Sequence, residues 1–430
     1  MGVLIEDSKT HRDLFKLNAT RNFIPASNVK LLTAIAALKL LGPNFHYTTR
    51  VYINKKQLKN HILRGNLVFY FTGDPTLTTA NLNALVRSIK KAGVHRVLGH
   101  VVIDHTYFEG PDIPIGWLKN DLSYCYGAKA SSVIINQNCM HVNLLETHTQ
   151  KTKLIKFPDS VYFKVNNTVK MVPRHELKKC VFWPEITHAN HVYLKGCLPP
   201  KEHYSFALAV QTPLLFAKTV LTQDLKRQHI VFSDPIISGT HYHENTILVK
   251  HTSKALSDIV KTMLQHSNNL YANAITRTLG KQYYGSGSFK AGVNAIKAIL
   301  LSKAKVNLLH SPMEDGSGLS RYNLVSPSHF VSLMNYALSQ PRLASALVSD
   351  LPLSGRSGTL YYRMRSEPLV GKVYAKTGSM QGISSLTGFM YTKEHHRIVF
   401  SIIMNNFTAP LNQARKLQDT LLHLVYMHVR

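Results

Sequence analysis

Long apolar runs and acidic residues are scarce in this sequence of 430 residues. Its longest apolar stretches, such as residues 31–38 and 398–404, are far shorter than the roughly 20 residues of a membrane-spanning helix, so we expect no such span. The opening residues Met1–Asp7 are typical of a β-strand and lack the basic, apolar and small-residue regions of a secretory leader. We therefore expect that the sequence has been trimmed at its N-terminus or that its start has been assigned too late.

The scarcity of acidic residues leaves a strong positive charge. Lys and Arg total 51 against 23 Asp and Glu, which gives a net charge of +28 at pH 7. This excess favours an anionic partner such as a membrane surface or an acidic cell-wall polymer. Because the lysines are scattered, diffuse charge that keeps the protein dissolved is the alternative. No basic and aromatic run resembles a nucleic-acid motif, so we do not expect nucleic acid as a partner.

Cysteine is also rare, and all four cysteines lie in one middle segment. An even, clustered number favours two disulfides in an oxidising compartment. Of the three possible pairings we predict Cys125–Cys139 and Cys180–Cys197, because each closes a short loop. Four buried thiols are the alternative. A zinc site is disfavoured because no C-x-x-C pair occurs.

Histidine is abundant, with 23 residues, so we searched for metal ligands. The best candidates, His241–Glu244 and His395–His396, do not have the H-E-x-x-H spacing of a zinc helix. We interpret them as exposed strand or turn residues and expect no metal. Neither G-x-G-x-x-G nor a P-loop occurs, so no nucleotide cofactor is expected either.

Hydrophobic periodicity predicts a helix-plus-sheet domain that is interrupted. Apolar residues at helical spacing predict one helix over 27–41 and another over 411–428. Between about 48 and 250, short β-like runs alternate with turn signals, and helical patterns resume from 252. Further β-runs are expected at 2–6, 13–17, 371–377, 382–391 and 397–404. The pattern indicates a β-rich insertion of about 200 residues in a domain made from both ends of the chain.

Three short motifs occur in a fixed order: Ser27–Lys30 reads S-x-x-K, Ser267–Asn269 reads S-x-N, and Lys376–Gly378 reads K-T-G. This ordered set is the signature of serine acyl-transfer enzymes. Ser27 and Lys30 are three residues apart at a helix start, so their side chains share one helix face. A desolvated lysine can be neutral enough to take the proton of a serine hydroxyl, which makes that serine a nucleophile.

The second and third motifs complete the predicted site. Ser267 can relay a proton to the leaving amine, and Asn269 can hydrogen-bond a substrate amide and the first-motif lysine. On an edge strand, Lys376 and Thr377 can hold a substrate carboxylate.

Backbone groups next to these side chains have a predicted role as well. Gly378 allows the backbone to approach the substrate closely. The N–H groups of Ser27 and Ser379 are predicted to form an oxyanion hole, which stabilises the negative charge that develops on an attacked carbonyl. K-T-G is expected at the end of its strand.

Each motif taken alone has a plain structural interpretation. Helix caps often carry serine or asparagine, and a lysine beside a glycine is common in turns. S-x-x-K also occurs at Ser88–Lys91 and Ser302–Lys305. The prediction therefore depends on the ordered trio, in which each motif has the expected local context.

With these motifs, the chain resembles the D-alanyl-D-alanine carboxypeptidase/endopeptidases of the S13 type, the low-molecular-mass class C penicillin-binding proteins. The likeness covers nearly the whole chain and is carried by four stretches, residues 23–33, 73–77, 315–321 and 375–382. It implies cleavage of D-Ala-D-Ala termini or D-Ala-diaminopimelate cross-links in peptidoglycan, covalent binding of β-lactam antibiotics and a periplasmic location. It also implies that Asp121, from the insertion, and Gln381 line the pocket for the peptide stem.

The resemblance implies an α+β fold as well. A β-lactamase/transpeptidase-like domain, with an antiparallel sheet and helices on both sides, is interrupted by two nested domains. We expect the catalytic domain at 1–48 and 252–430, inserted domain II at 49–143 and 237–251, and nested domain III at 144–236. Two other functions stay open: a non-catalytic murein-binding protein of the same fold, and a β-lactamase, which the insertion and the missing class A glutamate motif disfavour.

Overall fold

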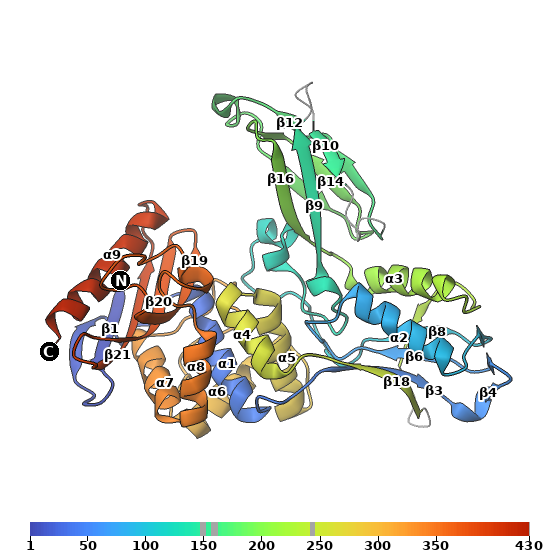
Figure 1. The fold of residues 1–430 in the computed structure, drawn as a ribbon, viewed down its shortest axis with the longest axis horizontal. Helices are drawn as coiled ribbons and strands as arrows, with labels where there is room; N and C mark the ends of the chain where they lie inside the picture. The colour runs from blue at the N-terminus through green and yellow to red at the C-terminus, as the bar shows by residue number, and fades with distance from the viewer. Residues whose placement is uncertain (147–151, 156–161, 241–245, 430) are drawn as a thin grey trace. The chain divides into compact units, whose positions relative to one another are not determined.

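The computed structural model describes residues 1–146, 152–155, 162–240 and 246–429. These residues form two compact units (Figure 1). Unit 1 comprises residues 1–45, 109–117 and 254–430, and unit 2 comprises 46–108 and 118–253. Both ends of the chain therefore belong to unit 1. The segment 109–117 lies within the range predicted for inserted domain II, and it belongs to unit 1.

Unit 1 contains an antiparallel sheet in the order β19-β20-β21-β1-β2. The predicted N-terminal hairpin and three C-terminal strands are confirmed, and the K-T-G motif is on an edge strand as expected. Its predicted position at a strand end is wrong, because the pairing with β20 continues to Met380. The strands are β1 (Gly2–Asp7), β2 (Asp13–Leu17), β19 (Val373–Met380), β20 (Ile383–Tyr391) and β21 (Arg397–Asn405).

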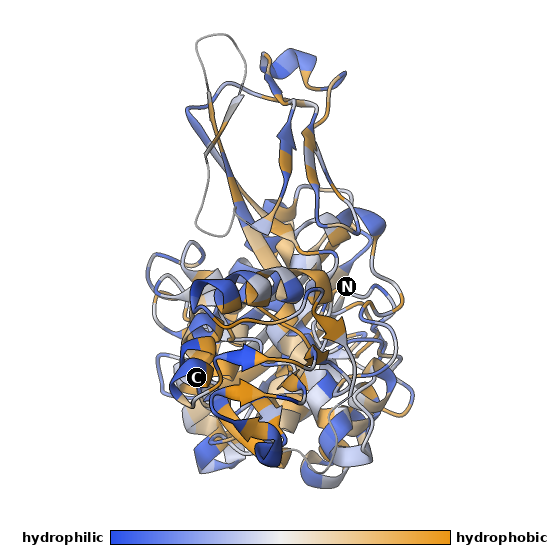
Figure 2. Cartoon of the chain, turned by 90° about the vertical axis from the view of Figure 1, so that its right-hand side faces the viewer, coloured by the Kyte–Doolittle hydropathy of each residue, from blue (hydrophilic) through white to orange (hydrophobic). Residues whose placement is uncertain are grey.

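The two faces of this sheet carry alternate residues of each strand, as strand geometry requires. On one face, Ala375 and Phe400 pack with Leu422 of the C-terminal helix α9 (Leu411–His428) in a buried apolar cluster. On the other face, the Thr387 hydroxyl accepts a hydrogen bond of 2.7 Å from the Asn28 side chain. Figure 2 shows apolar and polar residues alternating along the strands and helices of the chain.

The helices of unit 1 include both predicted terminal ones, and α9 has the predicted bounds. The first helix starts two residues later than predicted, because Asn28 N–H bonds to the Pro25 carbonyl at 3.2 Å and closes a 3₁₀ turn there. No helix among the described residues is long and apolar enough to cross a membrane. The other helices are η1 (Ala26–Asn28), α1 (Val29–Leu40), α4 (Leu256–His266), α5 (Asn269–Tyr284), α6 (Phe289–Ala304), α7 (Pro327–Ser339), α8 (Pro341–Asp350) and η8 (Gly358–Leu360).

Unit 2 is rich in strands, as the turn signals predict, but it also contains helices α2 (Thr79–Lys91) and α3 (Pro213–Arg227). Its larger sheet has the order β17-β8-β6-β3-β18. The strands and short helices are β3 (Thr48–Ile53), η2 (Lys55–Gln57), β4 (Leu58–Lys59), β5 (Ile62–Leu63), β6 (Leu67–Tyr70), β7 (Arg96–Val97), β8 (Val101–Asp104), η3 (Lys119–Ser123), η4 (Cys125–Gly127), η5 (Asn136–Asn138), β9 (Cys139–Glu146), β10 (Thr152–Ile155), β11 (Val165–Asn167), β12 (Lys170–Met171), η7 (Arg174–Glu176), β13 (Trp183–Ile186), β14 (Val192–Lys195), β15 (Cys197–Leu198), β16 (His203–Ala209), β17 (Ile237–Ser238) and β18 (Thr246–Thr252).

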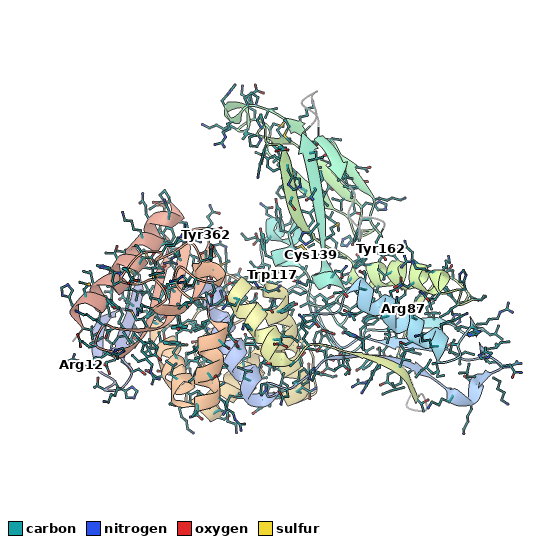
Figure 3. The ribbon with its side chains drawn as sticks, viewed as in Figure 1. Arg12, Arg87, Trp117, Cys139, Tyr162 and Tyr362 are labelled. Atoms are coloured by element: carbon teal, nitrogen blue, oxygen red, sulfur yellow. A yellow bond between two sulfur atoms is a disulfide. The ribbon has the colours of Figure 1, made fainter. Side chains whose placement is uncertain are left out.

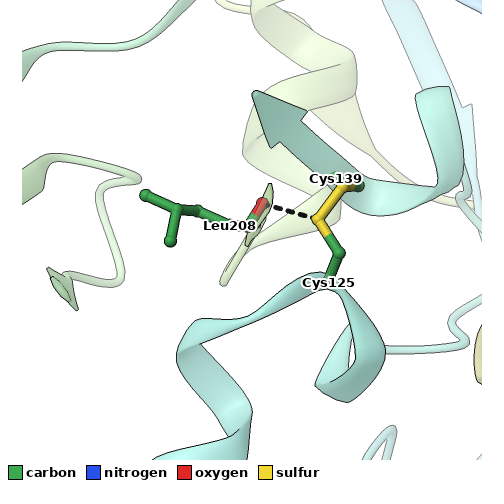
Figure 4. The surroundings of a disulfide bond; sticks show 3 residues. All are labelled: Cys125, Cys139 and Leu208. Atoms are coloured by element: carbon green, nitrogen blue, oxygen red, sulfur yellow. Dashed lines mark hydrogen bonds between the residues drawn. A yellow bond between two sulfur atoms is a disulfide. The ribbon is translucent and has the colours of Figure 1, made fainter. Parts of the chain in front are cut away.

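Both predicted disulfides are present in unit 2, with Cα–Cα distances of 5.2 Å for Cys125–Cys139 and 5.3 Å for Cys180–Cys197. The first links η4 to the start of β9, and its Cys125 sulfur lies 3.2 Å from the Leu208 carbonyl oxygen (Figure 4). A bonded sulfur has no proton to donate, so we interpret this contact as packing. Each bridge fixes a short loop against a strand.

Replacing Cys125 and Cys139 together by serine should lower the free energy of unfolding by about 3 kcal/mol, because a bridge across 14 residues no longer restricts the unfolded chain. Urea unfolding followed by circular dichroism measures this change. The matched Cys180→Ser/Cys197→Ser variant opens a loop of 17 residues and should lose a similar amount. Unchanged midpoints in both variants would contradict the expectation.

Candidate active site

The first motif brings a hydroxyl and an amine together at the start of α1. Lys30 Nζ lies 2.9 Å from Ser27 Oγ, and the lysine is fully buried. The predicted sharing of one helix face is therefore observed. The same nitrogen lies 2.6 Å from Asn269 Oδ1 and 2.6 Å from the Ser317 carbonyl oxygen. The amine thus has three polar neighbours and no contact with bulk water.

This environment favours the neutral form of the Lys30 amine. Burial lowers its pKa to about 7, and the negative charge of Asp315 partly opposes that effect. A neutral amine keeps two N–H donors and one lone pair. Because the oxygens of Asn269 and Ser317 can only accept hydrogen bonds, they orient the two donors and leave the lone pair facing Ser27.

The second motif lies at the junction of α4 and α5. Ser267 ends α4 in the left-handed conformation, with φ of +56°, a geometry that commonly terminates helices. Asn268 caps α5 by accepting a hydrogen bond of 3.0 Å from Tyr271 N–H. Asn269 is the first residue of α5, so its side chain can reach Lys30. The capping role therefore belongs to Asn268, whereas the side chains of Ser267 and Asn269 bond to Lys376 and Lys30.

The third motif lies within β19. Lys376 is fully buried, and its Nζ lies 2.9 Å from Ser267 Oγ. Burial is the main cause that lowers its pKa well below the ordinary value, and the nearby charge of Lys30 adds to the effect. A Cβ on Gly378 would lie 2.9 Å from Ser27 N, so only glycine lets β19 pass this close to the serine.

One part of the site was missed by the sequence reasoning. The loop 315–320 supplies the carbonyl oxygen of Ser317 that orients Lys30. Asp315 is fully buried and organises this loop by accepting six hydrogen bonds. Their donors are the N–H groups of Ser317, Gly318 and Ser320, Ser317 Oγ, Asn323 Nδ2 and Trp117 Nε1, at 2.7–3.1 Å. Trp117 is labelled in Figure 3 and comes from the segment 109–117.

A run of small residues around an aspartate, residues 315–320, was the available sequence signal for this loop. A Cβ on Gly318, whose φ is +81°, would lie 3.0 Å from Ser27 N and even closer to the Ala26 carbonyl oxygen. The loop therefore needs glycine for its own conformation and for its contact with the nucleophile turn.

The remaining predicted residues lie at the margin of this constellation or in unit 2. Ser379 is exposed and accepts a hydrogen bond of 3.2 Å from Arg415. Gln381 is in the turn between β19 and β20 and lines a cavity of about 720 Å³ with Met380 and Phe407. Asp121 lies in η3 of unit 2, where its carboxylate accepts a hydrogen bond of 3.1 Å from Tyr126. Binding of a peptide stem by Gln381 and Asp121 stays a prediction.

The competing motifs lack such partners. The hydroxyls of Ser88 and Ser302 donate to backbone carbonyls of their own helices, at 3.0 and 3.1 Å. His395–His396 occupies the turn after β20, where His396 Nδ1 lies 3.1 Å from Asp7 Oδ2, and His241–Glu244 falls outside the described residues. Among the residues that the structure describes, no cluster of three or more His, Cys, Asp or Glu side chains could hold a metal ion.

Comparison with known proteins adds independent information. Residues 1–424 match the model of the D-Ala-D-Ala carboxypeptidase 3 (S13) family. The D-alanyl-D-alanine carboxypeptidase DacB of Haemophilus influenzae is 30% identical over 95% of this chain and 86% of its own length.

Solved structures agree with this match. The crystal structure of penicillin-binding protein 4 from Haemophilus influenzae is 30% identical and superimposes with a TM-score of 0.91, over 99% of this chain and 96% of that one. A second structure of that protein, in complex with a novel β-lactam, gives a TM-score of 0.85 at 28% identity and the same coverage.

Acylation of Ser27 by a fluorescent penicillin should become faster as the pH rises through about 7, because Lys30 accepts a proton only in its neutral form. Asp315→Asn removes a negative charge that raises the Lys30 pKa, so the midpoint of this profile should move to lower pH. Labelling time courses over about pH 5 to 9 measure both midpoints. A variant that labels slowly with an unmoved midpoint would show that Asp315 acts only by shaping its loop.

Proposed function

Because the chain belongs to the D-Ala-D-Ala carboxypeptidase 3 (S13) family, and so is a serine-type D-Ala-D-Ala carboxypeptidase, we propose that it cleaves peptidoglycan stem peptides and cross-links through an acyl-enzyme on Ser27. The observation that carries the assignment of Ser27 is its 2.9 Å contact with the buried amine of Lys30. A hydroxyl next to a base whose pKa is lowered to about 7 has what a nucleophile needs.

Acylation begins when Ser27 Oγ attacks the carbonyl carbon of the penultimate D-alanine. The hydroxyl proton passes to Lys30 Nζ, whose lone pair faces it. The charge that develops on the carbonyl oxygen is stabilised by the backbone N–H groups of Ser27 and Ser379, in agreement with the close approach of β19 at Gly378. The C–N bond then breaks and leaves an ester on the serine.

The leaving amine must gain a proton as the bond breaks. Ser267 can donate its hydroxyl proton and recover one from Lys376, which lies 2.9 Å away. After acylation, proton exchange with the solvent returns Lys30 to its neutral form and Lys376 to its charged form. In the second half of the reaction, Lys30 takes a proton from the attacking water and gives it to Ser27 Oγ as the ester C–O bond breaks, which frees Ser27. Lys376 and Thr377 hold the carboxylate of the leaving residue, and Asn269 orients both the substrate amide and Lys30.

The partners and location follow from this chemistry and from the family. We propose peptidoglycan as the substrate and a periplasmic location. β-Lactams, one of which is bound in the penicillin-binding protein 4 complex, are expected to acylate the same serine. The net charge of +28 is suited to holding the enzyme on anionic murein or membrane. The nested arrangement of two inserted domains also stays a proposal. The separate sheets β10-β9-β16 and β17-β8-β6-β3-β18 of unit 2 support it.

The decisive experiment compares Ser27→Ala with the unaltered protein. The variant should lose labelling by fluorescent penicillin and at least roughly 10³-fold of the rate of D-alanine release from a stem pentapeptide, because no acyl-enzyme can form. Mass analysis of the muropeptides identifies free D-alanine and split dimers. Ser302→Ala is the matched control, since it removes the serine of another S-x-x-K match whose hydroxyl bonds only to its own helix.

Other outcomes would favour the alternatives. Binding to cell walls with unchanged muropeptides and no label would indicate a non-catalytic murein-binding protein. Fast release of hydrolysed penicillin from Ser27 would indicate a β-lactamase. Full activity in Ser27→Ala would contradict the assignment of the nucleophile.

A further inference from the structure

Next to the catalytic strand, unit 1 presents an exposed aromatic and cationic surface that the mechanism above does not use. Tyr361 and Tyr362 are 47% and 80% exposed, and their rings meet edge to face at a centroid distance of 4.8 Å. The Arg365 guanidinium lies 5.8 Å from the centre of the Tyr362 ring. Large aromatic side chains that stay in water beside an active site are typical of a binding surface. We call these three residues the tyrosine surface.

The two tyrosines of this surface are flanked by residues whose side chains are anchored in unit 1. Leu360, directly before the two tyrosines, is fully buried in the apolar cluster beneath α9. Arg363, directly after them, forms an ion pair with Asp419 and donates to Gln418 Oε1 at 3.2 Å. Since both flanking side chains are anchored, the two rings are held in place and little order must be gained on binding.

The residues just before the tyrosine surface contact the third motif and a residue next to the second motif. Thr359 Oγ1 accepts a hydrogen bond of 2.7 Å from the hydroxyl of Thr377 in the K-T-G motif. A Cβ on Gly358 would lie 2.5 Å from the side-chain oxygen of Gln265, which is two residues before Ser267. The segment therefore adjoins the groups that we assign to the leaving residue, namely its carboxylate site and its proton donor.

We propose that the tyrosine surface binds the leaving stem peptide of a cross-link, and so favours endopeptidase over carboxypeptidase action. This inference rests on the proposed function. In both reactions the leaving amine is on a carbon that bears a carboxylate, which Lys376 and Thr377 hold. A terminal D-alanine has no further residue beyond the carbon that bears this carboxylate. The leaving residue of a cross-link continues into a second stem peptide. Thr377 contacts Thr359, which lies two residues before the first tyrosine of the surface.

Charge complementarity supports this occupant. The second stem peptide carries further carboxylates, and residues 351–367 contain three arginines, Arg356, Arg363 and Arg365, against one acidic residue, Glu367. Arg363 is already paired with Asp419, whereas Arg356 and Arg365 are exposed. Planar tyrosine rings beside an arginine suit an extended peptide with anionic groups, because they supply contact area at a small cost in conformational entropy.

The test compares two substrates in one double variant, Tyr362→Ala/Arg365→Gln. For a cross-linked muropeptide dimer we expect kcat/KM to fall about tenfold, mainly through KM, because contacts to the leaving stem are lost. For a stem pentapeptide, kcat/KM and the rate of penicillin acylation should change less than about twofold. The KM for the dimer should also rise with salt in the unaltered enzyme and rise less in the variant, since screening weakens exposed charge pairs.

The chain offers a matched control. Tyr283 and Tyr284 form a second exposed pair with a centroid distance of 4.7 Å. They end α5, roughly 22 Å along the helix axis from Asn269 in the active site. Tyr283→Ala/Tyr284→Ala should leave both substrates unaffected.

Three results would overturn the inference: equal losses for dimer and pentapeptide, unchanged dimer cleavage in Tyr362→Ala/Arg365→Gln, or an equal loss of dimer cleavage in the control variant. Failure of the proposed function would look different, because the unaltered enzyme would then neither label with penicillin nor release D-alanine.

Discussion

The site depends on the removal of one amine from water. Lys30 is fully buried, and burial is what lowers its pKa to about 7, so that a base is available near neutral pH. Its acceptors come from distant parts of the chain, with the carbonyl of Ser317 287 residues away and the amide of Asn269 239 residues away. The fold of unit 1 therefore brings the oxygens of Asn269 and Ser317 to Lys30 Nζ and excludes water from this nitrogen.

A second buried lysine, Lys376, affects the protonation of the site. Lys376 is also fully buried, and the charge of each amine disfavours charge on the other. The two buried amines therefore favour a state in which at least one of them is neutral. A substrate carboxylate beside Lys376 would supply the missing negative charge, so binding and correct protonation support one another. The left-handed backbone of Ser267 is a further local strain that the surrounding packing must offset.

Features that depend on nearby residues in the sequence were mostly predicted correctly. Spacing located the three motifs, periodicity gave α9 its bounds, and short loops gave both disulfides. Features that depend on contacts across the chain were missed. Nothing local to Asp315 shows that its loop turns a carbonyl toward Lys30, and strand patterning did not show that β19 continues past Gly378. The left-handed Ser267 was also not predicted, because a serine carries no local signal for that conformation, which glycine usually adopts where a helix ends.

Asp315 shows that unit 1 depends on the segment 109–117, which lies between two stretches of unit 2 in the sequence. A carboxylate buried without partners would be strongly disfavoured, and six donors compensate Asp315. One of them, Trp117 Nε1 at 2.7 Å, lies on the segment 109–117, which the chain reaches only after passing through β3 to β8 of unit 2. The same segment carries Asp112, whose carboxylate pairs with the buried Arg277 of α5 at 2.7 Å. Because Asp315 both shapes the loop that orients Lys30 and raises the pKa that burial lowers, the Trp117 donor supports the surroundings of the Lys30 amine. Trp117 and Asp112 belong to unit 1, like the residues that they bond, so unit 1 is complete only with a segment that lies between two stretches of unit 2 in the sequence.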